Sequence, residues 1–292
     1  MKRFLNCPSC NSSNLKDLFE CKDHFLSHDD FSISCCNQCQ LLITNPQPSL
    51  SELGQYYKSE NYTSHKAEAT SILDYVYILA RKYTIASKLR IINRYQHNKT
   101  ILDYGCGTGD FLLGCKEKGW TTTGFEPSDH ARENALNKLE KDIHGNIDDL
   151  TKNHPYSIIT LWHVLEHVND LNETVANLRN LVTDNGKIIF ALPNHESYDA
   201  KYYGQYWAAY DVPRHLYHFS KDSMKYLLSN SGLKLDNIIP MKLDSYYISL
   251  LSEKYKTGRT NYLKSILTGY KSNVYGYKTG NYSSLIYICS KC

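Results

Sequence analysis

Short apolar runs alternate with helical patterns along residues 99–193, and this alternation limits the fold more than any other feature. The apolar runs TILDYG, TTTGFE, YSIITLWHV and GKIIFALPN are separated by DFLLGCKEKG, by SDHARENALNKLEK and by a helical pattern over 170–182. Strands that alternate with helices form βαβ units, whose strands run parallel. We therefore predict an α/β domain with a largely parallel sheet over 99–292, and the chain of 292 residues leaves room for a small appendage.

Segments on either side extend this pattern. Residues 70–95 place apolar side chains at helical spacing, which predicts a helix that covers the main domain. We assign 46–98 to a linker and this covering helix. SKDSMKYLLSNSG is typical of a helix capped by Ser220 and stopped by Gly232. LKLDNIIPMK is predicted as a strand, and SSLIYICSK as the last one.

Two CxxC pairs lie near the N-terminus, with 25 residues between them. Such pairs can wrap four thiolates around one tetrahedral ion, and the first residues, MKRFLNCPSC, show no export signal that would favour disulfides. We therefore predict a structural Zn²⁺ ribbon over 1–45, against the alternative of ordinary buried or redox cysteines. Cys35 is the replacement if Cys36 is not a ligand. The predicted ligands are Cys7, Cys10, Cys36 and Cys39.

A glycine-rich turn follows the first apolar run and opens a helix at Phe111. Its pattern is G-x-G-x-G followed by Asp110, whereas a dinucleotide site needs G-x-G-x-x-G and a helix N-terminus that accepts pyrophosphate. An acid there repels diphosphate but suits a phosphate-free cationic ligand such as S-adenosylmethionine. About twenty residues on, Glu126 ends the second strand, where its carboxylate can accept hydrogen bonds from a ribose diol.

The loop, the acid after the second strand and the segment LWHVLEHV resemble the class I S-adenosylmethionine-dependent methyltransferases. The resemblance covers about 99–292 and implies an αβα sandwich whose mostly parallel sheet has an antiparallel last strand. It also implies that the glycines line the methionine and ribose and that the adenine lies near Asn146, where the family usually has Asp, with Asp148 as the fallback. The implied cofactor residues are Asp103, Gly105, Gly107, Gly109, Glu126, Asn146, Ile147 and Trp162.

Two histidine-rich segments compete for the role of catalytic base, which methyl transfer needs when the acceptor must lose a proton. The first, LWHVLEH, resembles a segment of ubiquinone-pathway O-methyltransferases and small-RNA 3′-end methyltransferases in which an acid, a Glu and a His hold a divalent metal. His163 replaces the first acid here, so Glu166 and His167 are alternatively loop-fixing residues. We keep His163 as a candidate catalytic residue.

The second segment, YDVPRHLYHFS at 210–220, lies after the fifth predicted strand, where loops of a parallel sheet face the ligand crevice. This segment is either part of a substrate-binding site or a rigid, packed corner of the chain. With the ribbon in front, it resembles the His segment of nucleotide-sugar C-methyltransferases, although Val-Pro-Arg is inserted and their third domain is missing. The resemblance implies His215 as the base. We predict His215 or His218 as base, with Tyr210 and Arg214 binding substrate.

Residues 246–271 form a helical insertion ahead of the last strand, with Lys and Tyr expected on its outer faces. Such an insertion can cover a substrate or form a dimer contact. Basic and aromatic side chains on an apolar helix also favour a membrane surface, which we rank below the other two.

Charge and composition narrow the function. The formal net charge is only +3 and the ribbon has no basic cluster, which argues against nucleic acid as a partner. No apolar run is long enough to cross a bilayer, so we expect a cytoplasmic protein. We predict a methyltransferase acting on a small molecule, namely a sugar, nucleotide-sugar or related cell-surface precursor. The alternatives are an RNA-base methyltransferase and a non-catalytic cofactor-binding interaction protein. The sequence leaves the oligomeric state open.

Overall fold

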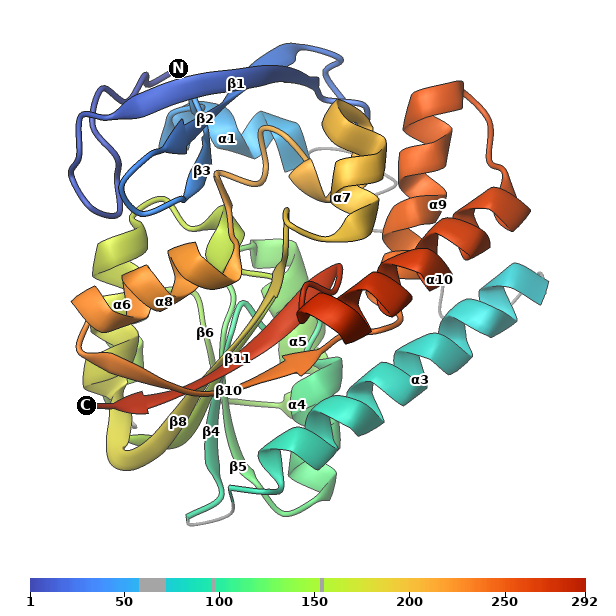
Figure 1. The fold of residues 1–292 in the computed structure, drawn as a ribbon. Helices are drawn as coiled ribbons and strands as arrows, with labels where there is room; N and C mark the ends of the chain where they lie inside the picture. Colours follow the sequence, from blue (N-terminus) through green and yellow to red (C-terminus); the bar gives the residue numbers. More distant parts are fainter. Residues whose placement is uncertain (58–71, 96–97, 153–154) are drawn as a thin grey trace.

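A seven-stranded sheet forms the centre of the molecule (Figure 1). The computed structural model describes residues 1–57, 72–95, 98–152 and 155–292. Within these ranges, the side chains of residues 50 and 72–78 are not described. The strand order is β10-β11-β8-β7-β4-β5-β6, and only β11 runs antiparallel to its neighbours. The strands are β4 (Thr100–Tyr104), β5 (Thr121–Phe125), β6 (Ile143–His144), β7 (Tyr156–Trp162), β8 (Val182–Pro193), β10 (Leu233–Pro240) and β11 (Ser284–Lys291).

Helices cover both faces of this sheet because its strands are apolar on both sides. Along β7, Ile159 points into one core with α6 (Leu171–Leu181) and α8 (Lys221–Asn230). Its neighbour Ile158 points into the other core, which contains α4 (Asp110–Glu117), α5 (Asp129–Leu139) and the end of α3 (Ile72–Ile92). The class I methyltransferase sandwich expected from the sequence, with its antiparallel last strand, is thus confirmed.

A second, four-stranded sheet joins the N-terminal segment to the later chain. Its strands are β1 (Leu15–Lys22), β2 (Asp30–Cys36), β3 (Leu42–Thr44) and β9 (Tyr217–His218), in that order. β9 pairs antiparallel with β3, so a strand from the second histidine segment completes the cysteine-rich sheet. The two parts of the chain therefore share one sheet and do not fold as separate layers.

Short helices make the remaining connections. Among the described residues, no helix is long and apolar enough to cross a membrane. The short elements are α1 (Leu50–Leu53), η1 (Gly54–Tyr57), η2 (Ile147–Lys152), η3 (Leu165–His167), α7 (Tyr198–Tyr203), η4 (Gly204–Tyr206) and η5 (Ala208–Tyr210).

Two helical segments expected from the sequence lie in the later part of the chain. The Ser220-capped helix is confirmed, because the Ser220 hydroxyl accepts the Ser223 N–H at the start of α8 and Gly232 follows with a φ of 66°. The helical insertion expected over 246–271 is present as two helices. The chain forms α9 (Asp244–Thr257) and α10 (Tyr262–Thr279), because Gly258 takes a left-handed conformation that ends the first helix.

The covering helix α3 lies where the sequence placed it, but it is only partly packed. Ile85 and Leu89 contact the helix α4 at Gly114, and Ile92 is fully buried. Leu79, one of the side chains expected on its apolar face, is 48% exposed. The side chains of Ile72, Leu73 and Val76 are outside the description, so the contacts predicted for them stay predictions.

One buried ion cluster holds the cysteine-rich sheet against the later chain. The Arg214 guanidinium donates to the carboxylates of Asp23 and Asp211, and the side chains of Arg214 and Asp23 are 1% and 0% exposed. Burial opposes ionisation of Asp23, but hydrogen bonds from Arg214 and from backbone N–H groups lower the pKa of Asp23 to about 2. The charges are therefore compensated inside the protein.

Replacing Arg214 by Met should destabilise the fold strongly, because Asp23 would remain buried without its counter-ion. We expect a loss of about 3–5 kcal/mol in the free energy of unfolding, measured by urea denaturation. Arg3→Met is the control, since Arg3 and Asp17 form an exposed pair and should contribute under about 1 kcal/mol. Equal losses in the two variants would contradict this role.

Candidate functional site

The glycine turn lies at the carboxyl end of β4 and has an open centre. Gly105, Gly107 and Gly109 all have positive φ, which L side chains rarely adopt. A Cβ on Gly105 would lie 2.5 Å from Val164, whereas one on Gly107 would meet no atom within 4 Å. The turn is therefore packed on one side by the segment after β7 and leaves space at Gly107.

Glu126 is fixed at the edge of that space. Its carboxylate accepts the Gly107 N–H at 2.9 Å with one oxygen and the Ser128 N–H at 3.0 Å with the other. The residue is 9% exposed and follows β5, the strand next to β4. Both oxygens are held in place with remaining lone pairs, which suits a ligand with two adjacent hydroxyls.

Asn146 and Ile147 follow β6, one strand further along the same edge. Asn146 is exposed and its side-chain oxygen accepts the Asp148 N–H at 3.1 Å, which fixes the turn. Ile147 is partly buried against the core. Both residues therefore lie at the same edge of the sheet as Glu126, on the side of Glu126 that faces away from β7.

Asp103 lies beneath the turn and is 3% exposed. Burial raises the pKa of Asp103 to about 7, although the Thr160 hydroxyl donates a hydrogen bond to its carboxylate at 2.6 Å. Such a carboxyl can become fully ionised when a cation approaches it.

Lys88 of α3 supplies a cation next to Asp103, a role that helical spacing alone does not indicate. Its Nζ lies 4.5 Å from the Trp162 ring centroid and 5.7 Å from that of Phe111. Burial lowers the pKa of Lys88, opposed by the charge of Asp103. Among the described residues it forms no hydrogen bond or ion pair within the usual distances. The aromatic faces of Trp162 and Phe111 thus line a place that accepts a positive charge.

The two histidine segments, about fifty residues apart in the sequence, lie side by side. The Leu216 N–H donates to the Glu166 carbonyl at 2.7 Å, and the rings of His167 and His215 meet edge to face at 4.5 Å. One ligating atom from each of Glu166, His167 and His215 lies within 4.8 Å of the others. Glu166 is 1% exposed, and neither of its carboxylate oxygens has a hydrogen-bond donor among the described residues.

His163 lies between Glu166 and Asp244. Asp244 is a site residue that the sequence analysis did not identify. His163 Nδ1 is 3.4 Å from the Glu166 carboxylate and Nε2 is 3.3 Å from that of Asp244. Burial disfavours the charged ring, but the two carboxylates outweigh it and raise the pKa of His163 to about 9. His163 is thus an imidazolium at neutral pH.

This imidazolium does not fit a divalent metal at the neighbouring cluster. In the resembling segment an acid stands at this position, whereas here a cation lies beside Glu166 and neutralises it. The burial of Glu166 raises its pKa, but the interaction with His163 and the charges of His215 and His167 together outweigh it, so the net shift is downward. The geometry therefore supports an ion-pairing role for Glu166 and a hydrogen-bonding role for His167, whose Nδ1 lies 3.0 Å from the Arg214 carbonyl, over metal binding.

His215 has the arrangement of a base. Its Nδ1 lies 2.8 Å from the Ala209 carbonyl, to which it can only donate, so in the neutral ring Nε2 carries the lone pair. Asp211 lies 4.0 Å from that Nε2. The contact with Ala209 therefore fixes both the orientation and the tautomer of the ring.

The other predicted residues of this segment are enclosed. His218 is 4% exposed and its Nε2 lies 3.1 Å from the Thr44 hydroxyl, and burial holds the pKa of His218 well below its usual value. Tyr210 is 5% exposed and stacks edge to face on Trp207. Arg214 is engaged by its two carboxylates. These three side chains are shielded from a ligand in this conformation.

A pocket of about 680 Å³ lies beside His163, over the half of the sheet away from the glycine turn. Asp244 forms part of its wall and links it to His163. The Asn273 side-chain oxygen is buried there with no hydrogen-bond donor among the described residues. The remaining wall is mainly apolar and aromatic and includes Tyr83, Lys88, Met241, Tyr246, Tyr270, Val274, Tyr277, Tyr282 and Ile286.

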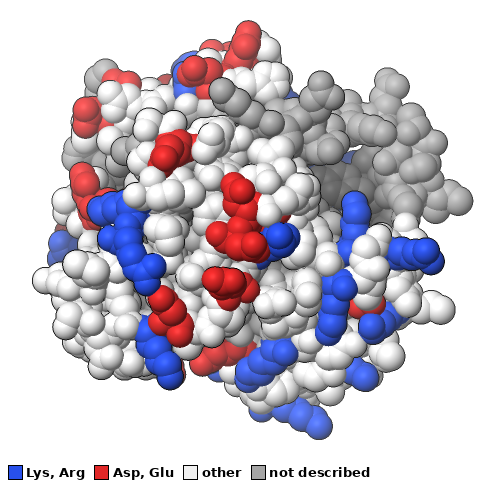
Figure 2. Space-filling model, turned by 90° about the horizontal axis from the view of Figure 1, so that it is seen from above, with Lys and Arg blue, Asp and Glu red and all other residues white. Residues whose placement is uncertain are grey.

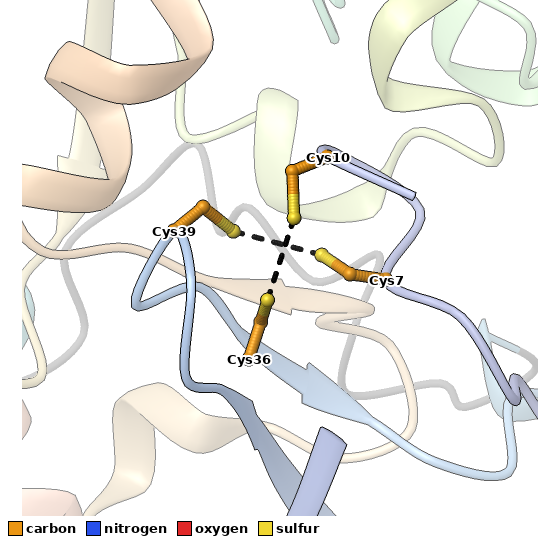
Figure 3. Close-up of side chains that lie close together, drawn as sticks. All are labelled: Cys7, Cys10, Cys36 and Cys39. Atoms are coloured by element: carbon orange, nitrogen blue, oxygen red, sulfur yellow. Dashed lines mark hydrogen bonds between the residues drawn. The ribbon is translucent and has the colours of Figure 1, made fainter. Parts of the chain in front are cut away.

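The four predicted zinc ligands converge at one end of the small sheet (Figure 3). The sulfurs of Cys7 and Cys39 lie 3.6 Å apart, and those of Cys10 and Cys36 lie 3.4 Å apart. A tetrahedral Zn²⁺ with Zn–S bonds of about 2.3 Å requires sulfurs about 3.8 Å apart. Cys35 is not part of the cluster. The four thiols therefore fit a closed structural zinc site.

Curated relatives match part of the chain. A ubiquinone biosynthesis O-methyltransferase of Saccharophagus degradans is 28% identical over 159 residues, which are 49% of this chain and 66% of that protein. The corresponding enzyme of Klebsiella pneumoniae is 32% identical over 104 residues, or 33% of this chain and 43% of the relative. The chain thus spans less than two thirds of the length of either.

The fold of the chain and its match to a family model both indicate a methyltransferase domain. The magnesium protoporphyrin IX methyltransferase of Synechocystis PCC 6803, solved with bound SAM, superposes with a TM-score of 0.52 at 13% identity, covering 85% of this chain and all of that one. This likeness shows the fold. The family model described as a methyltransferase domain matches residues 77–238, which is more than half of the chain. The chain therefore belongs to the methyltransferase domain family and has the class I methyltransferase fold.

Proposed function

We propose that this protein binds S-adenosylmethionine and transfers its methyl group to a small-molecule acceptor. The observation that carries the proposal is the polar arrangement at the glycine turn. Glu126 presents a fixed carboxylate beside the open position at Gly107, and the aromatic pair Trp162 and Phe111 already accepts the ammonium of Lys88. A site with these groups favours a cationic nucleoside without phosphate.

The residues divide between the parts of the cofactor. Glu126 would hold the ribose hydroxyls, while Asn146 and Ile147 would lie along the adenine. Asp103 lies beneath Gly105 and would face the amino-acid end, with Trp162 next to the sulfonium. Gly105, Gly107 and Gly109 allow the backbone to approach the ligand closely.

The acceptor would enter the pocket beside His163. Methyl transfer is an in-line displacement, so the pocket must align the acceptor with the transferable methyl group, which the bound cofactor supplies on a positively charged sulfur. His163 is protonated and bridges Asp244 to Glu166, so it would orient the acceptor without removing its proton. His215, with Nε2 as acceptor, is the better candidate for the base.

The finer proposal is a sugar, a nucleotide-sugar or a related cell-surface precursor as acceptor. The pocket offers tyrosine rings for stacking against a sugar ring, together with Asp244 and the Asn273 oxygen, which has no donor in the described part of the chain, for its hydroxyls. The relatives named above are O-methyltransferases, so a hydroxyl acceptor is the first to test.

Glu126→Gln should weaken binding of S-adenosylmethionine and of its demethylated product by at least about 100-fold, since a charged acceptor of ribose hydrogen bonds is lost. Isothermal titration calorimetry measures the dissociation constants directly. Glu133→Gln, an exposed carboxylate on α5, is the matched control and should bind normally. Normal binding by both variants would rule out the proposed cofactor site.

His215→Gln should lower turnover by about 100-fold or more while cofactor affinity stays normal, because a general base contributes to the chemical step alone. Tritium transfer from labelled cofactor to a panel of sugar nucleotides identifies the acceptor and measures the rate. The exposed His130→Gln is the control. An unchanged pH-rate profile in the His215 variant would assign the base elsewhere, and cofactor binding without any acceptor would support an interaction protein.

We also propose that Cys7, Cys10, Cys36 and Cys39 hold a structural Zn²⁺. A four-sulfur site has no open position for substrate, so the ion would stabilise the fold of a segment with a small core. The Asn172 side chain donates to the carbonyls of Pro8 and Ser9, which ties the first cysteine pair to α6. Zinc would therefore help to attach the N-terminal segment to the later chain, as Arg214 does through Asp23.

Cys36→Ser should abolish stoichiometric zinc, measured by mass spectrometry of the metal content, and should lower the melting temperature. Cys35→Ser is a close control, because it alters the neighbouring thiol, which lies outside the cluster. Loss of zinc from the Cys35 variant with retention in the Cys36 variant would reverse the ligand assignment.

A further inference from the structure

The helix α10 has a polar inner face and an apolar outer face, the reverse of an ordinary surface helix. Its buried positions are small residues, and the Ser272 hydroxyl donates to the buried carboxylate of Asp199. A Cβ on Gly269 would lie 2.7 Å from a ring carbon of Tyr246, so α10 packs closely on α9. The buried residues of α10 are Ser265, Thr268, Gly269, Ser272 and Gly276.

The outer face of α10 consists of large apolar side chains in contact with solvent. Their spacing follows one side of the helix, and Leu263 and Tyr277 are 83% and 84% exposed. The other exposed large apolar residues in the described parts of the chain are distributed over several elements, from the N-terminal segment to the start of α10. The outer face, here called the α10 stripe, comprises Leu263, Ile266, Leu267, Tyr270, Val274 and Tyr277.

Positive charge accompanies the α10 stripe. Lys264, Lys271 and Lys278 recur every seven residues, each directly after a stripe residue, and therefore follow one edge of the stripe. Lys264 is paired with Glu253 at 2.9 Å, so Lys271 and Lys278 carry most of the charge along this edge. Residues 242–280 contain seven Lys or Arg and two Asp or Glu, whereas the rest of the chain has more acidic than basic side chains. Figure 2 shows Lys and Arg spread over the right-hand side, the side of α9 and α10 in Figure 1, with uncharged surface between them.

The pocket beside His163 opens at the same surface. Tyr270, Val274 and Tyr277 belong both to the α10 stripe and to the pocket wall, opposite Tyr83 of α3. Tyr83 is itself 58% exposed. The apolar surface is thus continuous from the outer face of α10 into the pocket.

We propose that the α9–α10 hairpin docks on an anionic lipid surface, with the α10 stripe in the headgroup region. An apolar helix face edged by lysines and tyrosines has the composition of an interfacial helix, whose lysines reach lipid phosphates while their stems lie along apolar surface. A second copy of this chain is a poorer occupant, because two strongly basic hairpins would face each other. The proposal is independent of methyl transfer.

Flotation of the intact, zinc-loaded protein with vesicles tests this surface without cofactor or acceptor. Vesicles of phosphatidylcholine with phosphatidylglycerol should retain the protein, and vesicles of phosphatidylcholine alone should retain much less. Leu263→Ser combined with Leu267→Ser should reduce partitioning by about tenfold or more. Lys271→Gln combined with Lys278→Gln should reduce it mainly at low salt.

Leu5→Ser combined with Leu18→Ser is the matched control, because both leucines are exposed but lie in the N-terminal segment. This control should partition like the unmodified protein, and all variants should keep its melting temperature. No flotation with either vesicle, or equal loss in both leucine pairs, would overturn the proposal. A dimer in analytical ultracentrifugation that Leu263→Ser with Leu267→Ser dissociates would assign the stripe to a second copy instead.

Discussion

The buried guanidinium of Arg214 is the contact on which the arrangement of the site depends. It binds Asp23 at the end of β1 and Asp211 in the loop before β9, and both Arg214 and Asp23 are almost completely buried. Because β9 completes the cysteine-rich sheet, the loop that carries His215 is held by that sheet, and the Leu216 N–H also ties it to the segment after β7. The cysteine cluster and the ion cluster together fix a histidine that lies next to Arg214 but far from the cysteines and Asp23 in the sequence.

Electrostatics across the proposed site follow from its burial. Asp103 and Glu166 are carboxyls with little access to water, and each has a basic group nearby, Lys88 for the first and His163 for the second. Buried charge is tolerated only when it is compensated, so the cationic side chains stabilise the acids in the absence of a ligand. The same acids then suit a positively charged cofactor and an acceptor that offers hydroxyl groups.

The α9–α10 hairpin shows how a polar contact inside the protein can determine the surface. Asp199 is buried and accepts hydrogen bonds from Ser272, Ser283 and the Trp207 indole. Satisfying this carboxylate requires the serine side of α10 to face inward, which turns the leucines and tyrosines outward. An apolar face produced in this way has no partner within the described chain.

The sequence by itself determined the local features: strand and helix alternation, the glycine turn with Glu126, the Ser220 cap and the four-cysteine set. Each depends on spacing within a short stretch, where helical periodicity, turn geometry and ligand reach decide the outcome. Tertiary structure decided what depends on partners from distant segments. It placed His215 beside Glu166, enclosed His218, Tyr210 and Arg214, and brought Lys88 and Asp244 to the site. It also turned the α10 stripe outward, because spacing shows that a helix has two faces, whereas the groups packed against it decide which one is buried.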